Sequence, residues 1–456
     1  MKRIVYYRLR LTLESPLAIG SGTGASTDKD VIVDKYGVPF IPGTSIAGVL
    51  RSCFDEDDRK LLFGDVRINT GTDDGAFRDD AVESRLKVYD ALPDESAGKT
   101  SRYGRYYITQ RDCVALKDKV SVEGAKFDFE AVETGAAFVG FLEMTGDDDA
   151  VQTDAECKIE SVLARFQTGE LRLGGKTSRG YGRVSLTAQK KTFDLSSPTK
   201  TGGGEENGLT EWLDFDMFDA AAWKGVTPLA LSEERKQSHI VIQLKNKAGI
   251  SIREYSTDVS TEEETMPDYR HLSLHDRDNT PVIPGSCWAG AFRERFAAFT
   301  DNAAVRDFFG YVEQQKQEDG AEPIARKSRI LFSESRLSGG EWKVLTRNSI
   351  DRFSSATKDG NLYTEKTYYG GTTELDIMAD SELLKKYIVP FSCVLKDLHF
   401  GFLAVGGLTA VGRGLFAIGS ITVNGIDVTG TITSPDGVLT EKDIVCEARG
   451  EENHAE

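Results

Sequence analysis

One pattern occurs twice in this chain, and it constrains the fold more than any other feature of the sequence. Residues 39–51 match residues 281–293, and about half of the aligned positions are identical. A glycine-rich segment follows in each half, at residues 174–183 and at residues 406–414. Two matches in the same order at a similar offset indicate a structural unit duplicated in tandem. We therefore expect two similar domains.

The boundaries of these domains follow from the composition between the repeats. Residues 201–208 are polar and rich in glycine, as expected of a linker. We predict a first domain over residues 1–195, a linker over residues 196–236 and a second domain over residues 237–456. Four aromatic residues predict that the later part of the linker docks on the protein: Trp212, Phe215, Phe218 and Trp223.

Hydrophobic periodicity predicts the same order of elements in both halves. In the first half, residues 6–13 alternate as a strand, and residues 158–166 carry apolar side chains at helical spacing. The other expected elements are a hairpin of residues 31–33 and 39–41, a helix capped by Thr44 or Ser45 that runs to about Phe54, two strands within residues 127–144 and a strand from Val184; in the second half, a strand at residues 240–244, a helix at residues 287–299 and strands near Ile330 and Thr373. This order predicts an α+β class with two tandem ferredoxin-like (RRM-like) modules that contain inserted hairpins.

Charge restricts the class of function. The formal net charge is −17, which argues against nucleic-acid binding, because phosphate binding usually needs a positive surface. The acidic residues gather in short runs that indicate solvated loops, so a local basic groove stays compatible with the composition.

Targeting and cysteine patterns give further limits. The sequence contains no apolar run near the roughly 18 residues that a membrane helix requires. Charged and apolar residues alternate at its start, which indicates a strand and not a signal peptide, so we expect a cytoplasmic protein with no membrane partner. The six cysteines form no CxxC pair, which argues against a zinc ribbon or a disulfide framework.

The repeated segments resemble the RAMP superfamily of CRISPR-associated proteins, and most of all the backbone subunits of type III effector complexes. The resemblance rests on residues 39–45, 111–114, 125–130, 173–183, 348–353 and 370–375. Two copies on one chain resemble the fused backbone subunits of type III-D-like systems. The resemblance implies two RAMP modules that bind a CRISPR guide RNA and present it to a target RNA. It also implies partner subunits: a large polymerase-like subunit, further backbone subunits and small subunits.

The resemblance further implies a catalytic residue. Cleavage in this family depends on an aspartate in the loop before the hairpin, and the matching residue is Asp28, with Asp30 as a second candidate. The RNA 2′-hydroxyl would attack the adjacent phosphate, assisted by a divalent cation, Mg²⁺ or Mn²⁺, with Asp28 as its ligand. The first half contains no histidine, which excludes a histidine acid–base pair within it. Without the resemblance, both aspartates would be interpreted as solvated loop carboxylates.

The second half departs from this pattern. When its repeat is aligned through Pro281, Arg270 occupies the position of Asp28, and Asp268 lies two residues earlier. We expect a degenerate or shifted site in this half, and a shifted loop would use Asp268.

Cationic and aromatic residues alternate between residues 84 and 111. This composition suits an RNA strand whose bases stack while its phosphates pair with cations, and in the family this region forms a thumb-like hairpin. The glycine-rich loops would add charge and exposed backbone N–H groups. The candidate RNA-binding residues are Arg51, Arg85, Lys87, Arg102, Arg105, Arg111, Lys176, Arg179, Arg183, Arg293, Arg352 and Arg413. The alternatives are an ordinary amphipathic hairpin, simple glycine turns, and intrachain ion pairs for Arg51 and Arg293.

The resemblance therefore implies a guide-RNA-binding backbone subunit that is also a metal-dependent endoribonuclease. One alternative is a scaffold subunit of the same complex without nuclease activity. A guide-processing endoribonuclease of the same superfamily is less favoured, because such enzymes often use histidine near the start of the chain, which this sequence lacks there. No Walker-type phosphate loop, zinc-spaced histidine set or nucleophile elbow occurs in the sequence.

Overall fold

The chain forms two compact units. The computed structural model describes residues 3–22, 24, 27–66, 81–94, 108–117, 120–146, 149–195, 208–231, 237–254, 269–273, 279–313 and 324–444. Unit 1 comprises Met1–Gly175 and Gly182–Arg235, and unit 2 comprises Lys176–Tyr181 and Lys236–Glu456. The segment Lys176–Tyr181 therefore belongs to unit 2, although it lies within the first half of the sequence.

Unit 1 is built on an antiparallel sheet whose central strand is β1 (Arg3–Leu13). This strand lies between β8 (Ala137–Gly146) and β9 (Val184–Asp194). The short strands β4 (Leu86–Val88) and β5 (Leu92–Pro93) also pair with β8. The strand predicted over residues 6–13 is confirmed, and it begins earlier, at Arg3.

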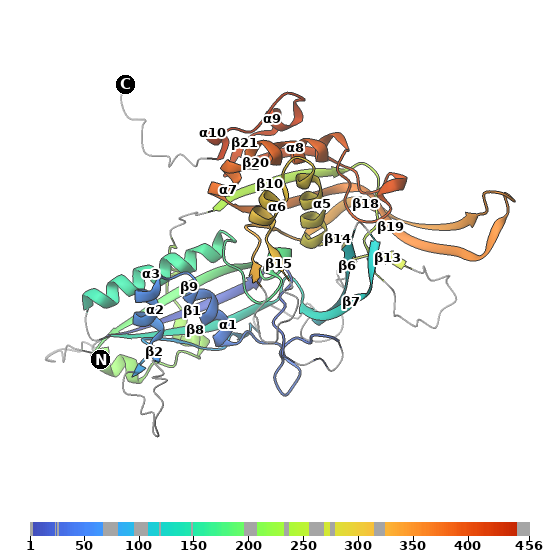
Figure 1. The fold of residues 1–456 in the computed structure, drawn as a ribbon. Helices are drawn as coiled ribbons and strands as arrows, with labels where there is room; N and C mark the ends of the chain where they lie inside the picture. Colours follow the sequence, from blue (N-terminus) through green and yellow to red (C-terminus); the bar gives the residue numbers. More distant parts are fainter. Residues whose placement is uncertain are drawn as a thin grey trace, which may run out of the picture. The chain divides into compact units, whose positions relative to one another are not determined.

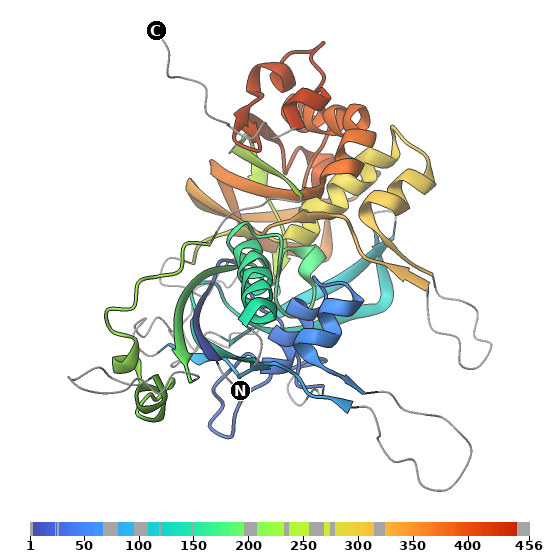
Figure 2. The ribbon, with the colours of Figure 1, turned by 90° about the vertical axis from the view of Figure 1, so that its left-hand side faces the viewer.

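Three helices cover one face of this sheet: α1 (Gly43–Arg51), α2 (Glu56–Phe63) and α3 (Asp149–Gln167), as Figures 1 and 2 show. Alternate residues of β1, among them Val5 and Leu9, are buried in this interface together with the apolar face of α3. That face was predicted from helical spacing and is confirmed, since Ile159, Val162, Leu163 and Phe166 are all buried.

The start of α1 differs from the prediction. We expected a side-chain cap at residues 44–45, but Pro42 is the N-cap and its side chain accepts no hydrogen bond. The Gly43 N–H instead donates to the Asp90 carboxylate over 2.7 Å. A Cβ on Gly43 would lie 2.3 Å from the Val88 carbonyl oxygen, so only glycine allows this approach to β4. Tertiary packing, and not a local cap, begins the helix.

The later part of the predicted linker covers the opposite face of the unit 1 sheet. It forms α4 (Gly208–Leu213) and a short 3-10 turn (Ala220–Trp223). An apolar cluster joins it to the sheet, with Ile4, Tyr6, Phe141, Phe193, Met217 and Trp223 buried. The Trp212 indole N–H donates to the Tyr6 hydroxyl over 3.1 Å. The prediction that these aromatic residues dock on the protein is confirmed.

Two pairs of strands in unit 1 lie outside the main sheet. β6 (Ile108–Lys117) and β7 (Val120–Val132) form a long antiparallel hairpin, and β2 (Asp65–Val66) pairs with β3 (Ala81–Val82). The region predicted to be thumb-like, residues 84–111, is described only in part, because residues 95–107 lie outside the described ranges. The hairpin that the structure does describe overlaps only the end of that region.

Unit 2 has a larger sheet with a similar centre. β10 (Gln237–Asn246) lies between β19 (Thr357–Asp380) and β20 (Phe416–Val423). The remaining strands are β11 (Gly249–Ile250), β12 (Arg253–Glu254), β13 (Tyr269–His271), β14 (Val282–Ile283), β17 (Ile330–Phe332), β18 (Ser335–Ile350) and β21 (Ile426–Asp427), while β15 (Tyr311–Glu313) pairs with β16 (Ile324–Arg326) separately. β18 and β19 continue beyond the sheet as a long hairpin, orange in Figure 1.

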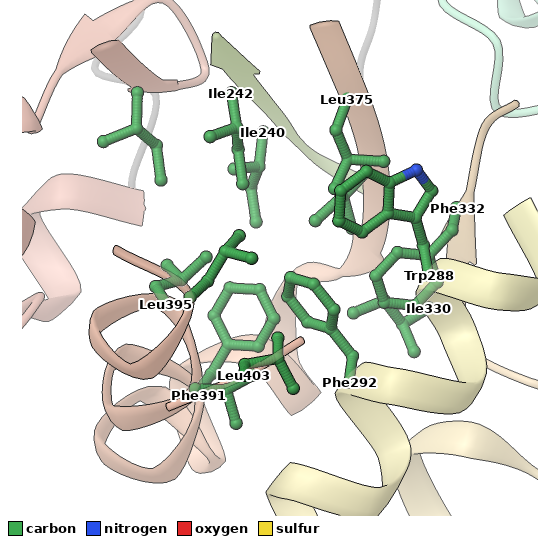
Figure 3. Close-up of a cluster of buried hydrophobic side chains, with 14 of the residues drawn as sticks. Ile240, Ile242, Trp288, Phe292, Ile330, Phe332, Leu375, Phe391, Leu395 and Leu403 are labelled. Atoms are coloured by element: carbon green, nitrogen blue, oxygen red, sulfur yellow. The ribbon is translucent and has the colours of Figure 1, made fainter. Parts of the chain in front are cut away.

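The core of unit 2 lies between this sheet and its helices. They are α5 (Gly285–Ala297), α6 (Asn302–Phe309), α7 (Ser381–Lys386), α8 (Ile388–Phe400), α9 (Thr429–Thr433) and α10 (Glu441–Ile444). Figure 3 shows side chains of α5 and α8 meeting those of the strands. The Phe292 ring lies 4.9 Å from that of Phe332 and 6.3 Å from that of Phe391. The helix predicted at residues 287–299 is present as α5.

The two halves repeat local backbone geometry. Asp55 caps α2, which ends at Gly64 with φ 74° and ψ 174°. In the same way, Asp301 caps α6, which ends at Gly310 with φ 73° and ψ 174°. The mixed helices and strands agree with the predicted α+β class, and the ferredoxin-like description of each half stays a prediction.

His271 of β13 is fully buried in unit 2. Burial lowers its pKa to about 3, because the charged ring would lose its hydration. Its Nδ1 accepts a hydrogen bond from the Ile252 N–H over 3.0 Å, which holds the neutral ring in one tautomer.

We expect His271 to make unit 2 sensitive to acid. Its folded-state pKa lies below the ordinary value of 6.5, so the unfolded chain binds the proton first as the pH falls. The free energy of unfolding should therefore decrease by up to about 1.4 kcal/mol per pH unit, from pH 6.5 toward pH 3. Denaturant titrations over this window, followed by tryptophan fluorescence, to which Trp342 beside His271 contributes, should show a shallower pH dependence in His271→Gln. An unchanged slope would remove His271 as the cause.

Candidate nucleic-acid interface

The loop that carries Asp28 leads into the short hairpin that was predicted before α1. Val33 pairs with Pro39, and the Asp34 N–H donates to the Val38 carbonyl over 2.9 Å. The Asp34 carboxylate accepts hydrogen bonds from the Tyr36 and Val38 N–H groups over 2.8 and 2.9 Å. These local bonds make a tight turn and give the Asp28 loop a fixed end.

Asp28 is joined to β7 by a reciprocal pair of hydrogen bonds. Its N–H donates to the Asp128 carboxylate over 2.9 Å, and the Asp128 N–H donates to Oδ2 of Asp28 over 3.0 Å. Gln110 donates to the other carboxylate oxygen of Asp128. Asp28 is exposed, and its Oδ1 makes no hydrogen bond among the residues that the structure describes. The loop is therefore fixed while one carboxylate oxygen stays accessible.

Asp30 has a different environment from Asp28. Its carboxylate accepts hydrogen bonds from the N–H and the hydroxyl of Thr27 over 2.9 and 2.8 Å. Glu130 binds the same loop, since its carboxylate accepts from the Val31 N–H and its own N–H donates to the Lys29 carbonyl, both over 3.0 Å. Asp30 thus closes the turn, which supports Asp28 as the residue that faces a ligand.

A divalent cation fits this loop only if RNA supplies some of its ligands. Within the described ranges, no three carboxylate, histidine or cysteine side chains converge to hold a metal ion. Mg²⁺ commonly binds through one or two carboxylates and completes its octahedron with waters and substrate phosphates, and Mn²⁺ accepts the same ligands. Asp28 fits a cation that is held together with RNA, and not one caged by protein alone.

Arg111, a predicted RNA contact, is buried in unit 1. Its guanidinium forms an ion pair with Glu133 at 2.6 Å, and Thr109 donates to the same carboxylate. A buried guanidinium that already has a carboxylate partner is not available to a phosphate. This geometry argues against Arg111 as an RNA contact, and we leave it out of the interface.

Arg413 of unit 2 is likewise buried and paired with a carboxylate. Its side chain is 3% exposed and forms an ion pair with Glu365, which is 1% exposed. It also donates to the Thr367 hydroxyl over 2.9 Å. Like Arg111, it stabilises the base of a hairpin instead of meeting solvent, and we leave it out as well.

Arg51 and Arg293 are exposed, at equivalent positions of α1 and α5. In the described part of the chain neither side chain forms a hydrogen bond or an ion pair. The alternative of intrachain ion pairs thus finds no support there, and both guanidinium groups can reach a phosphate.

The other described candidates of unit 1 are partly engaged. Arg85 is half-buried, and Lys87 forms an ion pair with Glu143 at 2.9 Å. The hydrogen bond to Glu143 raises the pKa of Lys87, which remains a cation. Arg183 forms an ion pair with Glu14 at 2.8 Å.

Three further candidates, besides Arg293 and Arg413, lie in unit 2. Arg179 is exposed and Lys176 half-buried, both in the segment Lys176–Tyr181. Arg352 is exposed at the end of the β18–β19 hairpin, beside Phe353, whose side chain is 99% exposed. Phe353 was not predicted as a site residue from the sequence, although an aromatic residue beside an arginine in a turn is a usable signal for base stacking.

Three predicted residues, Arg102, Arg105 and Asp268, lie outside the described ranges. Backbone hydrogen bonds in the described residues beside Asp268 nevertheless correct the alignment of Asp28 with the second half. The Leu272 N–H donates to the Ile252 carbonyl over 2.8 Å, as the Ile32 N–H donates to the Ile19 carbonyl over 2.9 Å. Counting back four residues from each N–H makes Asp268, and not Arg270, the sequence counterpart of Asp28.

Comparison with known proteins identifies a family. The model of the RAMP superfamily matches residues 10–185 and again residues 192–417. The two matches correspond to the two repeats and together cover most of the chain. No curated protein sequence matches the chain. Among the helices that the structure describes, none has the length and apolar character needed to cross a membrane.

Proposed function

Because the chain belongs to the RAMP superfamily of CRISPR-associated RNA-binding proteins, we propose that it is a guide-RNA-binding backbone subunit of a type III effector complex. Its two family matches support a fused, type III-D-like subunit that carries two RAMP modules. In this proposal it works in the cytoplasm with guide RNA, target RNA and the other effector subunits, and it cleaves the target RNA with Asp28 as the catalytic residue.

The fixed Asp28 loop carries the proposal of cleavage. Asp128 and Gln110 are joined to this loop by hydrogen bonds, so the Asp28 backbone is positioned before any RNA arrives. A positioned carboxylate needs no reorganisation during reaction, which is the general condition for an efficient site.

The chemistry requires the 2′-hydroxyl of one nucleotide to attack the adjacent phosphate in line. A divalent cation held by Asp28 and RNA would lower the pKa of that hydroxyl and stabilise charge on the phosphorane. The protein's own contribution is geometric: Asp28 presents Oδ1, and Asp128 keeps Oδ2 turned toward β7. Asp268 would take the same role in the second module, since it is the counterpart of Asp28 in the sequence.

A non-catalytic scaffold is the second candidate. It is favoured by one observation: the described residues contain no cluster of three metal ligands. In that case the Asp28 loop would position RNA without cutting it, and RNA binding would be the only activity.

The described cations suggest where RNA would bind. Arg51 and Arg293 supply equivalent exposed charges in the two repeats, and Arg352 with Phe353 supplies a charge and a stacking surface on the β18–β19 hairpin. Arginine with an aromatic residue suits a single strand, because every base has a face that can stack.

We expect Arg51→Ala combined with Arg293→Ala to weaken RNA binding in a salt-dependent way. Each lost phosphate contact should lower the slope of log affinity against log salt by about 0.7 for a single strand. The measurement is a titration of a fluorescent guide-length RNA at several salt concentrations.

Arg295→Ala is the matched control for this double variant. Arg295 lies on the same helix as Arg293 but forms an ion pair with Asp397. Its loss should leave the salt dependence of RNA binding unchanged. An equal effect of the control, or no change in the double variant, would count against the proposed RNA path.

A further inference from the structure

Unit 2 carries an exposed basic patch, none of whose residues belongs to the RNA path proposed above. The basic patch consists of Arg326 at the end of β16, Lys327 and Arg329 just after it, and Lys386 at the end of α7. All four residues are exposed. The whole chain has a formal net charge of −17, so a local concentration of cations indicates an anionic partner.

A carboxylate of α6 joins the two parts of the basic patch. Asp307 forms ion pairs with Arg326 at 2.8 Å and with Lys386 at 3.2 Å, through different oxygens. The Tyr387 hydroxyl donates to the second oxygen over 3.1 Å. The Asp307 side chain is 20% exposed, whereas that of Lys386 is 59% exposed. A partly buried carboxylate therefore holds two exposed cations side by side and neutralises only one of their charges.

The other two cations are bound more weakly within the protein. Arg329 lies 3.5 Å from Asp380, and an ion pair between partly exposed side chains contributes little in water. The Lys327 side chain forms no hydrogen bond or ion pair among the residues that the structure describes. Four cations thus share two carboxylates, Asp307 and Asp380, and the basic patch keeps an excess of positive charge.

The repeat in unit 1 shows that the fold does not require these cations. A Cβ on the glycine that ends α6 would lie 2.4 Å from the Arg326 carbonyl oxygen, and one on the glycine that ends α2 would lie 2.3 Å from that of Val82. Val82 is therefore the counterpart of Arg326, and Glu83 is the counterpart of Lys327. The same backbone forms in unit 1 with an apolar and an acidic residue, so the charge of the basic patch serves something other than folding.

The surroundings of the basic patch favour phosphates over bases. Two aromatic rings border it, and a cation covers each of them. The Arg306 guanidinium lies 3.8 Å from the centre of the Tyr311 ring, and Lys386 Nζ lies 4.8 Å from that of Tyr387. Single-strand sites usually combine charge with rings on which bases stack. Duplex nucleic acid keeps its bases stacked inside, presents its phosphates outward and has the higher charge density.

We infer that the basic patch binds the phosphate backbone of duplex nucleic acid without regard to sequence. This inference goes beyond the proposed function, in which Arg51 and Arg293 contact a single strand, and it does not depend on that path. With so few contacts, we expect a dissociation constant of about 10⁻⁴–10⁻⁶ M, as is usual for non-specific binding.

The first test compares Lys327→Ala combined with Lys386→Ala against Lys224→Ala combined with Lys245→Ala. Lys224 and Lys245 are exposed, and in the described part of the chain their side chains form no hydrogen bond or ion pair, so both double variants change the net charge equally. A short fluorescent DNA duplex is titrated at several salt concentrations with excess single-stranded RNA present. The slope of log affinity against log salt should fall by about 1.8 in the patch variant, because each lost phosphate contact removes about 0.9. The slope of the control should match that of the wild type.

A second test uses the wild-type chain and so does not depend on the folding of a variant. Lysine side chains are acetylated with and without the duplex, and the modified positions are identified by mass spectrometry. The duplex should protect Lys327 and Lys386 from acetylation and leave Lys245 as reactive as before.

Several results would overturn the inference. They are a wild type that binds no duplex, equal slopes in the two double variants, or duplex binding without protection of Lys327 and Lys386. Protection of these lysines by an acidic partner subunit and not by the duplex would assign the basic patch to a protein and overturn it as well.

These outcomes are separable from the proposed function. Arg51→Ala combined with Arg293→Ala should weaken binding of single-stranded RNA and leave duplex binding unchanged. An equal loss of duplex binding in that variant would show a shared surface and contradict a separate basic patch. A chain that binds the duplex through the basic patch and binds no guide-length RNA would remove the proposed function and leave this inference in place.

Discussion

Replacing Arg413 with methionine is expected to lower the free energy of unfolding of unit 2 by about 3–5 kcal/mol, because it leaves a buried carboxylate without its partner. Glu365 is 1% exposed, and its only other cation in the described ranges is Arg347, at 3.7 Å. Desolvation of an unpaired charge costs more than the loss of one hydrogen bond. Denaturant unfolding followed by tryptophan fluorescence measures the change, in chains whose unit 1 residues Trp212 and Trp223 are replaced by phenylalanine so that Trp288 and Trp342 report on unit 2 alone.

Arg347→Met is the matched control for Arg413→Met. Its side chain is 34% exposed and faces the same Glu365. A pair with one half-exposed partner is partly screened by solvent, so this variant should cost less than about 1 kcal/mol. The double variant Arg413→Met with Glu365→Gln should recover part of the loss, because the buried charge is gone. Equal destabilisation by Arg413→Met and Arg347→Met would show that the buried ion pair stabilises unit 2 no more than the half-exposed pair does.

Asp28→Asn is expected to reduce cleavage of a complementary target RNA by about 100-fold or more while target binding is kept. Asparagine preserves the shape of the side chain and an oxygen that can accept from the Asp128 N–H, so the loop should stay in place. It removes the charge that would hold a cation. Cleavage is measured on the assembled complex with guide RNA, in single turnover, and binding is measured on the same sample.

Asp30→Asn is the comparison for Asp28→Asn, since Asp30 lies in the same loop but accepts two hydrogen bonds from Thr27. Asp30→Asn should reduce cleavage much less than Asp28→Asn does. Any reduction should come from weaker hydrogen bonds between residue 30 and Thr27, which hold the loop in place. Asp268→Asn reports separately on the second module. A wild-type complex that binds the target and never cuts it would favour the scaffold. Loss of cleavage in Asp30→Asn alone would move the catalytic role to Asp30.

Only the local contacts of the loop around Asp28 were predictable from the sequence. The hairpin of residues 31–33 and 39–41 followed from its turn residues, because such turns are stabilised by neighbours in the chain. Asp128 was not predictable as the partner of Asp28, since the two residues are 100 positions apart and no spacing rule joins them. For the same reason the sequence repeat aligned Arg270 with Asp28. The backbone hydrogen bonds of the two halves shift this alignment by two residues, to Asp268.

The sequence by itself determined the duplication, the main strands and helices and the docking of the aromatic linker. These features depend on repeats, periodicity and composition, which are properties of short segments. Only the tertiary structure decided which arginines are available. Arg413 and Arg293 look alike in sequence, yet one is buried against Glu365 and the other is exposed. The physical reason is that a charge is neutralised or solvated by whatever the fold brings beside it, and strands distant in sequence supply that neighbour.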